Sequence, residues 1–355
     1  MSDHQPNYGT GKDLPVLEFI WGHLTHRVPR PEGDLRGQVA LVTGATSGLG
    51  FETAKHFARL NISKLVLPVR SRPKGEQTIA SLYAQVPSFR GQIHLVDLDL
   101  SRLASIPLCV SQLRSGLDLE RLDFAILNAG VAHTRFVATQ EDAYEETMQV
   151  NVLATGLLAV MLLPLLSQTA DLPALPGGTT LKPQLEIVAS EVHYWVNPAN
   201  LPRSGSGAPG SFLSELCSEP YHARLPPLEA YQISKLLDVF LARKLAALPA
   251  AEKVQVTATN PGLCKSAFRD ESGPVVAGLL NLISWRAEFG SRTFLHAVLN
   301  DFPSGSYISA GQLTPTSTFS CSAEGIRVED EFWADFQALC EKVAPETKET
   351  FRTKV

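Results

Sequence analysis

The sequence predicts an α/β protein with a Rossmann-type, doubly wound parallel sheet of about seven strands flanked by helices. Three observations predict it: short apolar strands alternate with helical stretches from residue 38 onward, a glycine-rich turn at 43–50 follows the first strand, and polar residues stand at the ends of later strands. Such alternation requires right-handed crossovers and helices on both faces of the sheet. The 355 residues are enough to bury the core of one large or two small domains.

The elements can be assigned in chain order. Strands are expected at 38–42, 64–69, 93–96, 122–127, 185–189 and 254–258, each a short and mostly apolar run of the kind that is buried on both faces. Helices are expected at 51–60, 74–85, 142–166, 228–248 and 330–343, and one more follows the third strand and ends at about residue 113. We therefore divide the chain into an N-terminal extension (1–37), a Rossmann-fold domain (38–315) and a C-terminal helical segment (316–355).

Two apolar stretches need an interpretation. Residues 14–21 favour a short amphipathic helix, which either packs on the body of the domain or binds a membrane surface or a partner. Residues 150–166 are mostly apolar, but this run is short for a bilayer of about 30 Å, and it contains Asn151 and Pro164. We expect a buried helix there and no transmembrane span.

Composition narrows the function classes. The net charge of −5 disfavours nucleic-acid binding, which needs clustered Lys and Arg. The five cysteines are widely spaced, which disfavours a disulfide scaffold or a zinc site, so we expect no metal. Residues 1–15 are polar and contain no secretory core, and reduced thiols fit a cytoplasmic protein.

The turn at 43–50 is typical of a dinucleotide site. Glycines let the backbone approach a pyrophosphate closely, and the helix that follows offers free N–H groups and the positive end of its dipole. No Lys-Ser or Lys-Thr follows the last glycine, so the turn is not a Walker phosphate loop. A tight structural turn is the alternative. The candidate cofactor residues are Thr43, Gly44, Thr46, Ser47, Gly48, Leu49 and Gly50.

The end of the second strand predicts which cofactor binds. An acidic residue there binds the ribose 2′-OH of NAD, whereas a basic residue accommodates the 2′-phosphate of NADP. Residues 69–74 contain Arg70, Arg72 and Lys74 and no acid. We therefore expect NADP(H), with Arg70 as the leading contact and Lys74 beside it. A solvated basic turn is the alternative.

Two further strand ends contribute to the predicted cofactor site. Asp99 and Leu100 follow the third strand, where Asp99 either approaches the adenine amino group or caps a helix. Asn128, Ala129 and Gly130 end the fourth strand, and small residues there let the backbone lie beside the cofactor.

Four polar residues predict a proton-transfer site. Tyr231 and Lys235 are four apart in a helical stretch and share a face, so the ammonium is expected to favour the phenolate and lower the tyrosine pKa. Ser190 ends the fifth strand, where its hydroxyl either binds the substrate oxygen or caps a turn. Asn151 lies in an apolar helix and needs a partner, either a proton-relaying water or the backbone.

These motifs resemble the short-chain dehydrogenase/reductase superfamily over about residues 36–312. The resemblance implies a catalytic tetrad of Asn151, Ser190, Tyr231 and Lys235, in which Lys235 also binds the nicotinamide ribose and Tyr231 exchanges the proton. It implies that Pro261, Gly262, Leu263 and Ser266 contact the nicotinamide side, and that homodimers form through the helices carrying Asn151 and Tyr231. Residues 188–193 add a similarity to retinol-dehydrogenase-like enzymes and to reductases of fungal secondary-metabolite pathways.

The chain departs from that family between Ser190 and Tyr231, where 40 residues stand, far more than the family usually has. We interpret 197–227 as an insertion that forms either a substrate lid or a surface loop. Val192 and Trp195 are the expected substrate contacts beside Ser190 and Tyr231. The apolar candidates for a pocket wall are Trp195, Phe212, Leu213, Leu216 and Tyr221.

The expected function is NADP(H)-dependent reduction of a ketone or aldehyde, or oxidation of the alcohol, in a medium-sized apolar molecule of secondary metabolism. Tyr231 exchanges the proton and Ser190 orients the substrate oxygen. Two alternatives stay open, because a fold does not fix a reaction. One is a non-redox cyclase or isomerase on the same scaffold, and the other is an NADP-sensing protein that binds without turnover.

Overall fold

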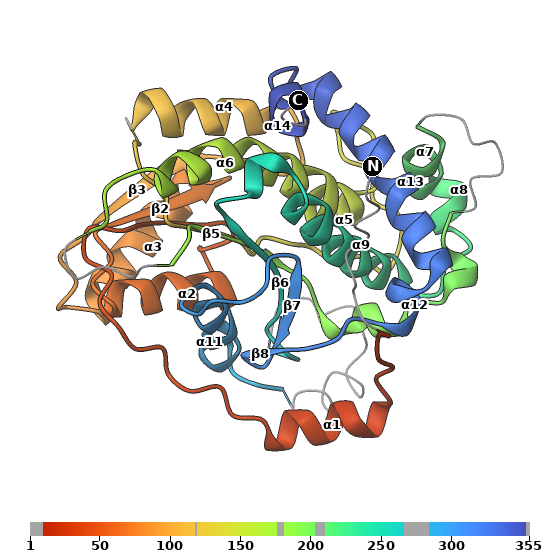
Figure 1. Ribbon diagram of the computed structural model, residues 1–355, viewed down its shortest axis with the longest axis horizontal. Helices are drawn as coiled ribbons and strands as arrows, with labels where there is room; N and C mark the ends of the chain where they lie inside the picture. The colour runs from red at the N-terminus through yellow and green to blue at the C-terminus, as the bar shows by residue number, and fades with distance from the viewer. Residues whose placement is uncertain (1–9, 118, 176–180, 203–209, 266–283, 353–355) are drawn as a thin grey trace.

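The computed structural model describes residues 10–117, 119–175, 181–202, 210–265 and 284–352. In these residues one sheet has the order β3-β2-β1-β4-β5-β6-β7-β8, and every pair is parallel except β7 with β8 (Figure 1). The predicted Rossmann-type sheet is confirmed, with one short strand more than expected. The strands are β1 (Val39–Val42), β2 (Lys64–Val69), β3 (Gln92–Asp97), β4 (Phe124–Leu127), β5 (Gln184–Val188), β6 (Gln255–Asn260), β7 (Ser306–Ser309) and β8 (Gln312–Leu313).

The strand order locates the ligand-binding edge. β1, β2 and β3 follow one another toward one side of the sheet, whereas β4, β5 and β6 continue toward the other. The direction reverses between β1 and β4. Ligands of doubly wound sheets bind outside the carboxyl ends of the strands at such a point. The residues that follow β1, β4 and β5 are therefore the ones to examine for a site.

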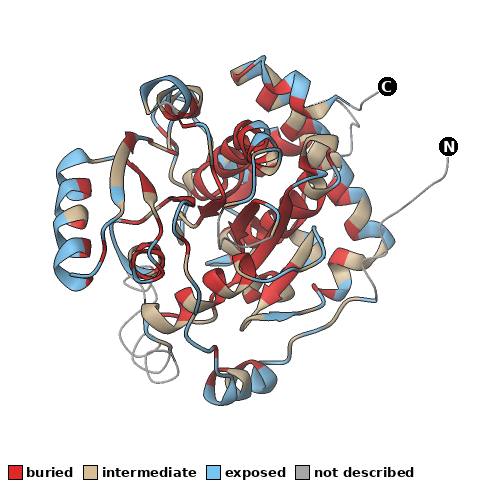
Figure 2. Ribbon diagram, turned by 60° about the vertical axis from the view of Figure 1, so that its left-hand side comes forward, coloured by how far each residue is buried: buried red, intermediate tan, exposed pale blue. Residues whose placement is uncertain are grey.

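Helices cover both faces of the sheet (Figure 1). α2 (Gly48–Arg59), α3 (Arg72–Gln85) and α11 (Ala287–Val298) lie on one face, and α4 (Ser105–Ser111), α6 (Thr155–Ala170) and α9 (Glu229–Ala246) lie on the other. The buried apolar side chains accordingly form two clusters. Figure 2 shows that burial is concentrated in the strands and in the helix faces that meet them, while the outer faces are exposed.

The long apolar stretch forms one continuous helix from α5 (Glu146–Met148) through the π-helical turn η2 (Gln149–Ala154) into α6. This helix is long and apolar enough to cross a membrane, but 89% of its most apolar window is buried inside the protein. It is therefore a core helix, as predicted. It continues to Ala170, four residues beyond the predicted end, and its interior Pro164 lies on the exposed side.

The C-terminal segment covers the outside of the helical layer. It contains α12 (Thr318–Cys321), α13 (Ala323–Val343), which is longer than predicted, and α14 (Thr347–Phe351). The contact with α6 is close, since a Cβ placed on Gly156 would lie 2.6 Å from the Phe336 ring. The family resemblance implies a homodimer through the helix that carries Asn151. The part of this helix around Gly156 is covered by α13 of the same chain.

The insertion at 197–227 contains α7 (Ser211–Leu216) and α8 (Glu219–His222), and it packs on this segment through α7. The Phe212 ring packs against Phe332 of α13 at 6.4 Å between centroids, and Asp335 accepts hydrogen bonds from the Gly210 and Leu213 N–H groups. The expectation that its apolar residues form a pocket wall is wrong for Phe212, Leu213, Leu216 and Tyr221, because all four are buried in the core.

The N-terminal extension forms α1 (Val16–Thr25), close to the amphipathic helix expected at 14–21. Phe19 and His23 are buried toward the body, whereas Leu17, Trp21 and Leu24 are exposed on the outer side. Residues just before α1 pair with the C-terminal segment, where the Lys12 N–H donates to the Thr316 carbonyl and the Thr318 N–H donates to the Lys12 carbonyl. The N-terminal extension therefore runs beside the start of the C-terminal segment.

Candidate active site

The three glycines of the glycine-rich turn have different surroundings. A Cβ on Gly50 would lie 2.4 Å from the Gly44 carbonyl oxygen, and a Cβ on Gly44 would lie 2.9 Å from the Asn128 amide. Gly48 has a φ of +55° and no atom within 4 Å of its Cβ position. Gly44 and Gly50 thus close the turn, whereas Gly48 faces open space at the start of α2, where a pyrophosphate would meet the helix N-terminus.

The ends of β1 and β4 are held together beside this turn. The Asn128 amide donates to the Thr43 carbonyl at 3.0 Å, and the Ala129 N–H donates to the Thr43 hydroxyl at 3.0 Å. A Cβ on Gly130 would lie 3.1 Å from the Asn151 side-chain oxygen. Small residues at 129 and 130 therefore let the chain pass between the turn and η2. The residues present fit a dinucleotide pyrophosphate on this side of the sheet.

The basic turn after β2 presents two of its three cations freely. Arg72 forms a bidentate ion pair with Asp97 at the end of β3, with both N–O distances at 2.9 Å. Arg70 and Lys74 are exposed, and no ion pair of either is found among the described residues. Arg72 is therefore engaged with its own carboxylate, and Arg70 and Lys74 are the cations left for a 2′-phosphate.

Asp99 caps the turn that follows β3. Its Oδ1 accepts hydrogen bonds from the Ser101 N–H at 3.0 Å and the Ser101 hydroxyl at 2.7 Å. Leu100 is buried in the core. Asp99 therefore caps a turn and not a helix, because α4 begins at Ser105 with Ala104 as its N-cap. Its approach to the adenine stays a prediction, and Leu100 offers at most its backbone to a cofactor.

Asn151 is satisfied by protein groups. Its amide exchanges two hydrogen bonds with the backbone of Val131, at 2.8 and 2.9 Å, and donates a third to the Ser234 hydroxyl at 3.0 Å. The side chain therefore joins the chain after β4 to the catalytic helix α9. Of the two partners weighed from the sequence, the backbone is the one observed.

Ser190 and Tyr231 meet at the carboxyl end of β5. Ser190 begins the 3-10 turn η3 (Glu191–Trp195), and its hydroxyl accepts a long hydrogen bond of 3.4 Å from the Val192 N–H. A hydrogen bond joins the Ser190 and Tyr231 side chains. Two hydroxyl groups from different elements thus converge at the edge where a substrate oxygen is expected.

Lys235 lies one turn further along α9, with its Nζ 5.7 Å from the centre of the Tyr231 ring. It is buried and donates hydrogen bonds to the Val188 carbonyl at 2.7 Å and to Asp238 Oδ2 at 2.8 Å. Asp238 was missed from the sequence. The signal that identifies it is its position three residues after Lys235, which places it on the same helix face.

The electrostatics differ from the expectation in one respect. Burial raises the pKa of Tyr231 above its ordinary value, and although the Lys235 ammonium lowers it, the Asp238 carboxylate raises it again. The predicted lowering by Lys235 is present but is outweighed. Burial lowers the pKa of Lys235, but Asp238 and Tyr231 raise it, and the net direction is upward. Lys235 is therefore held firmly as a cation.

The loop after β6 completes this edge. The Gly262 N–H donates to the Asn260 side chain at 3.0 Å, and Gly262 has a φ of +73°. Leu263 follows, whereas Ser266 lies outside the described residues. Of the expected substrate contacts, Trp195 packs on Phe19 of α1 at 5.2 Å between ring centroids, and Val192 is half-buried on η3.

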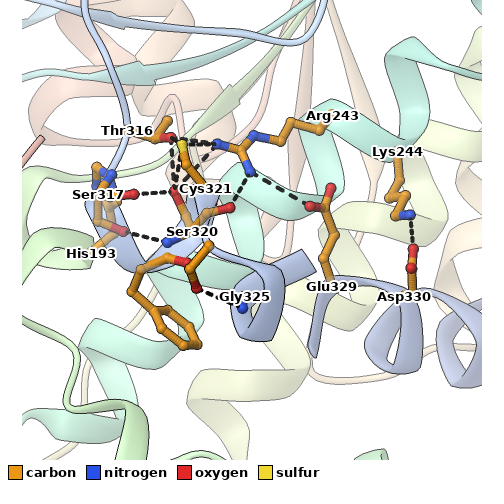
Figure 3. Close-up of polar contacts among 12 residues, drawn as sticks. His193, Arg243, Lys244, Thr316, Ser317, Ser320, Cys321, Gly325, Glu329 and Asp330 are labelled. Atoms are coloured by element: carbon orange, nitrogen blue, oxygen red, sulfur yellow. Dashed lines mark hydrogen bonds and ion pairs between the residues drawn. The ribbon is translucent and has the colours of Figure 1, made fainter. Parts of the chain in front are cut away.

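The catalytic helix and the η3 turn are anchored to the C-terminal segment (Figure 3). The buried Arg243 of α9 donates to the Ser320 carbonyl at 2.8 Å and lies 3.5 Å from the Glu329 carboxylate. His193 of η3 accepts a hydrogen bond from the Ser317 N–H at 3.2 Å, and its other ring nitrogen lies 2.7 Å from the Ser190 carbonyl. Residues beyond the Rossmann core thus support the turn that carries Ser190.

Comparisons with known proteins agree with the fold. The short chain dehydrogenase family matches residues 38–171. The chain is 37% identical to "Short chain dehydrogenase opdN" of Penicillium oxalicum over 89% of this chain and 100% of that protein, and 30% identical to "Short-chain dehydrogenase anuD" of Penicillium roqueforti over 94% and 85%. An NADPH-dependent 3-quinuclidinone reductase from Rhodotorula rubra shares the fold, with a TM-score of 0.56, 17% identity, and coverage of 80% of this chain and 91% of that one.

Proposed function

Because the chain belongs to the short-chain dehydrogenase/reductase family, an oxidoreductase family, we propose that it is an NADP(H)-dependent reductase of ketones or aldehydes, or the reverse alcohol dehydrogenase. We place its substrate among medium-sized apolar molecules of a secondary-metabolite pathway, as the sequence resemblance implies. The half-buried, apolar Val192, two residues after Ser190, supports this choice, whereas the Trp195 side chain packs on Phe19 of α1.

One observation supports the proposal most strongly. At the carboxyl edge of the sheet, next to the glycine-rich turn, the Tyr231 side chain lies between a hydrogen bond with Ser190 and the ammonium of Lys235. In reduction, the two hydroxyls bind the substrate oxygen, and Tyr231 donates the proton that this oxygen takes up. A bound nicotinamide supplies the hydride. Lys235 keeps a positive charge beside the phenolate that forms, which lowers the free energy of that state.

Asn151 has a positioning role in this proposal. It joins the Val131 backbone to Ser234, which lies between Tyr231 and Lys235 on α9. The bonds keep the end of β4 at a fixed distance from the catalytic helix. A change at Asn151 would therefore move the cofactor side of the site relative to the proton donor.

Arg70 and Lys74 support the choice of NADP(H), since both are exposed at the end of β2 where the 2′-phosphate is expected. The test measures NADPH and NADH consumption with a panel of bulky apolar ketones, for the parent and for Arg70→Asp. A charge-assisted hydrogen bond contributes about 1.5–3 kcal/mol, so the KM for NADPH should rise about 10- to 150-fold while NADH is little affected.

The matched control is Arg90→Asp, an exposed arginine just before β3 at the opposite, amino edge of the sheet. It makes the same charge change away from the site and should leave both KM values unchanged. Equal use of NADH by the parent would overturn the NADP preference alone. Loss of NADPH affinity in both variants would mean that net charge, rather than Arg70, is responsible.

A further inference from the structure

The N-terminal helix α1 places one histidine between two loops of the active-site edge. The Nε2 atom of the buried His23 lies 2.6 Å from the Leu263 backbone nitrogen and 3.3 Å from the Glu191 carboxyl. Leu263 follows the Pro261-Gly262 pair after β6, and Glu191 follows Ser190 after β5. A residue from the extension thus reaches the ends of both strands.

The hydrogen bonds define the role of each ring nitrogen. Nδ1 of His23 lies 2.9 Å from the Phe19 carbonyl, which only accepts, so Nδ1 carries the proton. Nε2 then has its lone pair free to accept from the Leu263 N–H. The ring is neutral, which agrees with the direction in which burial shifts the pKa of His23, downward.

The position of α1 is fixed by further contacts on both sides of His23. The Trp195 indole N–H donates to the Leu14 carbonyl at 2.9 Å, and the Trp285 indole N–H donates to the His23 carbonyl at 2.8 Å. A Cβ on Gly262 would lie 2.7 Å from the Trp285 ring and 3.2 Å from His23 Nε2. The loop after β6 is therefore packed directly against this helix.

We propose that His23 is a positioning residue of the reaction: by accepting the Leu263 N–H, it holds the 261–263 loop where this loop meets the nicotinamide. This inference rests on the proposed function for the identity of the ligand. The N-terminal extension is then part of the active site, although it lies outside the residues that match the family.

The test compares His23→Leu with His23→Gln. Leucine has a similar volume but leaves the Leu263 N–H without its acceptor, whereas the glutamine Oε1 can replace Nε2. The control is Trp21→Ala, on the exposed face of the same helix. The readouts are the NADPH dissociation constant by calorimetry, KM and kcat for a ketone, the melting temperature, and amide exchange of the peptide containing Leu263.

We expect His23→Leu to weaken NADPH binding about tenfold and to speed exchange of the Leu263 amide, with His23→Gln and Trp21→Ala close to the parent. Parent-like binding and exchange in His23→Leu would overturn the proposal. Equal losses in His23→Leu and His23→Gln that follow the melting temperature would also overturn it, because they indicate a purely structural role. A parent that binds no nicotinamide nucleotide would refute the proposed function, and the exchange data would still decide whether His23 holds Leu263.

Discussion

Lys235 and Asp238 form a buried ion pair within one turn of the catalytic helix, with 2.8 Å between Nζ and Oδ2. The other carboxylate oxygen, Oδ1, is buried and has no hydrogen-bond partner among the described residues. Burial raises the pKa of Asp238 to about 6, although Lys235 lowers it. The Lys235 ammonium beside Tyr231 is therefore paired with the Asp238 carboxylate, and this carboxylate influences the pKa of Tyr231.

Replacing Asp238 with asparagine should shift the pH profile of reduction to lower pH. The Asp238 charge raises the pKa of Tyr231, so its removal lowers that pKa. Reduction needs the protonated tyrosine, so kcat/KM falls as the pH rises through this pKa. In Asp238→Asn the fall should begin at lower pH, as measured by kcat/KM for a ketone from pH 8 to about 11.5, a range that extends past the ordinary tyrosine pKa of about 10. An alkaline limb at the parent position would show that Asp238 does not act on Tyr231.

Gly48→Ala should weaken NADPH binding beyond its effect on stability. A residue with positive φ costs about 1–2 kcal/mol, and the added methyl group points into the space expected for the pyrophosphate. Gly210→Ala is the matched control, because Gly210 also has a positive φ and no atom within 4 Å of its Cβ position. Both variants should lose similar stability to urea, and only Gly48→Ala should lose at least tenfold in NADPH affinity. Equal affinities would remove Gly48 from the cofactor site.

Glu186→Gln should become more stabilising as the pH rises. Glu186 is fully buried on β5, and burial raises its pKa well above the ordinary value. The folded protein keeps this proton while the unfolded chain releases it, so the parent loses stability above the unfolded pKa, by at most about 1.4 kcal/mol per pH unit. The advantage of Glu186→Gln in urea unfolding should grow from pH 5 to pH 8, whereas the exposed Glu252→Gln should show no trend.

Arg243→Met should destabilise the protein by about 3–5 kcal/mol, because it leaves the buried Glu329 unpaired. The double variant Arg243→Met/Glu329→Met should lose less than the sum of the single changes. The neighbouring Lys244→Met, which breaks the exposed pair with Asp330 (Figure 3), should cost about 1 kcal/mol or less. Additive losses in urea unfolding would show that Arg243 and Glu329 are not coupled.

Local patterns were sufficient to locate the strands β1 to β6 and most of the helices between them, but not β7, β8 or α11. Alternation of apolar runs locates buried strands, and a glycine-rich turn between a strand and a helix is a local feature. The sequence also predicted that the apolar run 150–166 forms a buried helix and not a transmembrane span, because the run is short and contains Asn151 and Pro164.

Contacts between distant parts of the chain were not predictable in this way. His23 and Leu263 are 240 positions apart, and neither carries a sequence signal for the other. The insertion was expected to have an apolar wall, but Phe212 and Tyr221 pack into the core, and Phe212 does so against Phe332 of the distant α13. The net pKa of Tyr231 depends on burial and on Asp238 as well as on Lys235, and only coordinates place these effects together.

The central claim is hydride transfer assisted by Tyr231. It is tested most directly with NADPH that carries deuterium at nicotinamide C4, on both faces, with a bulky apolar ketone, by mass spectrometry of the product. The account predicts one deuterium on the carbinol carbon with the parent, and a loss of about 10²–10⁴-fold in rate with Tyr231→Phe at similar NADPH affinity. A product without deuterium, or a Tyr231→Phe variant as fast as the parent, would contradict it.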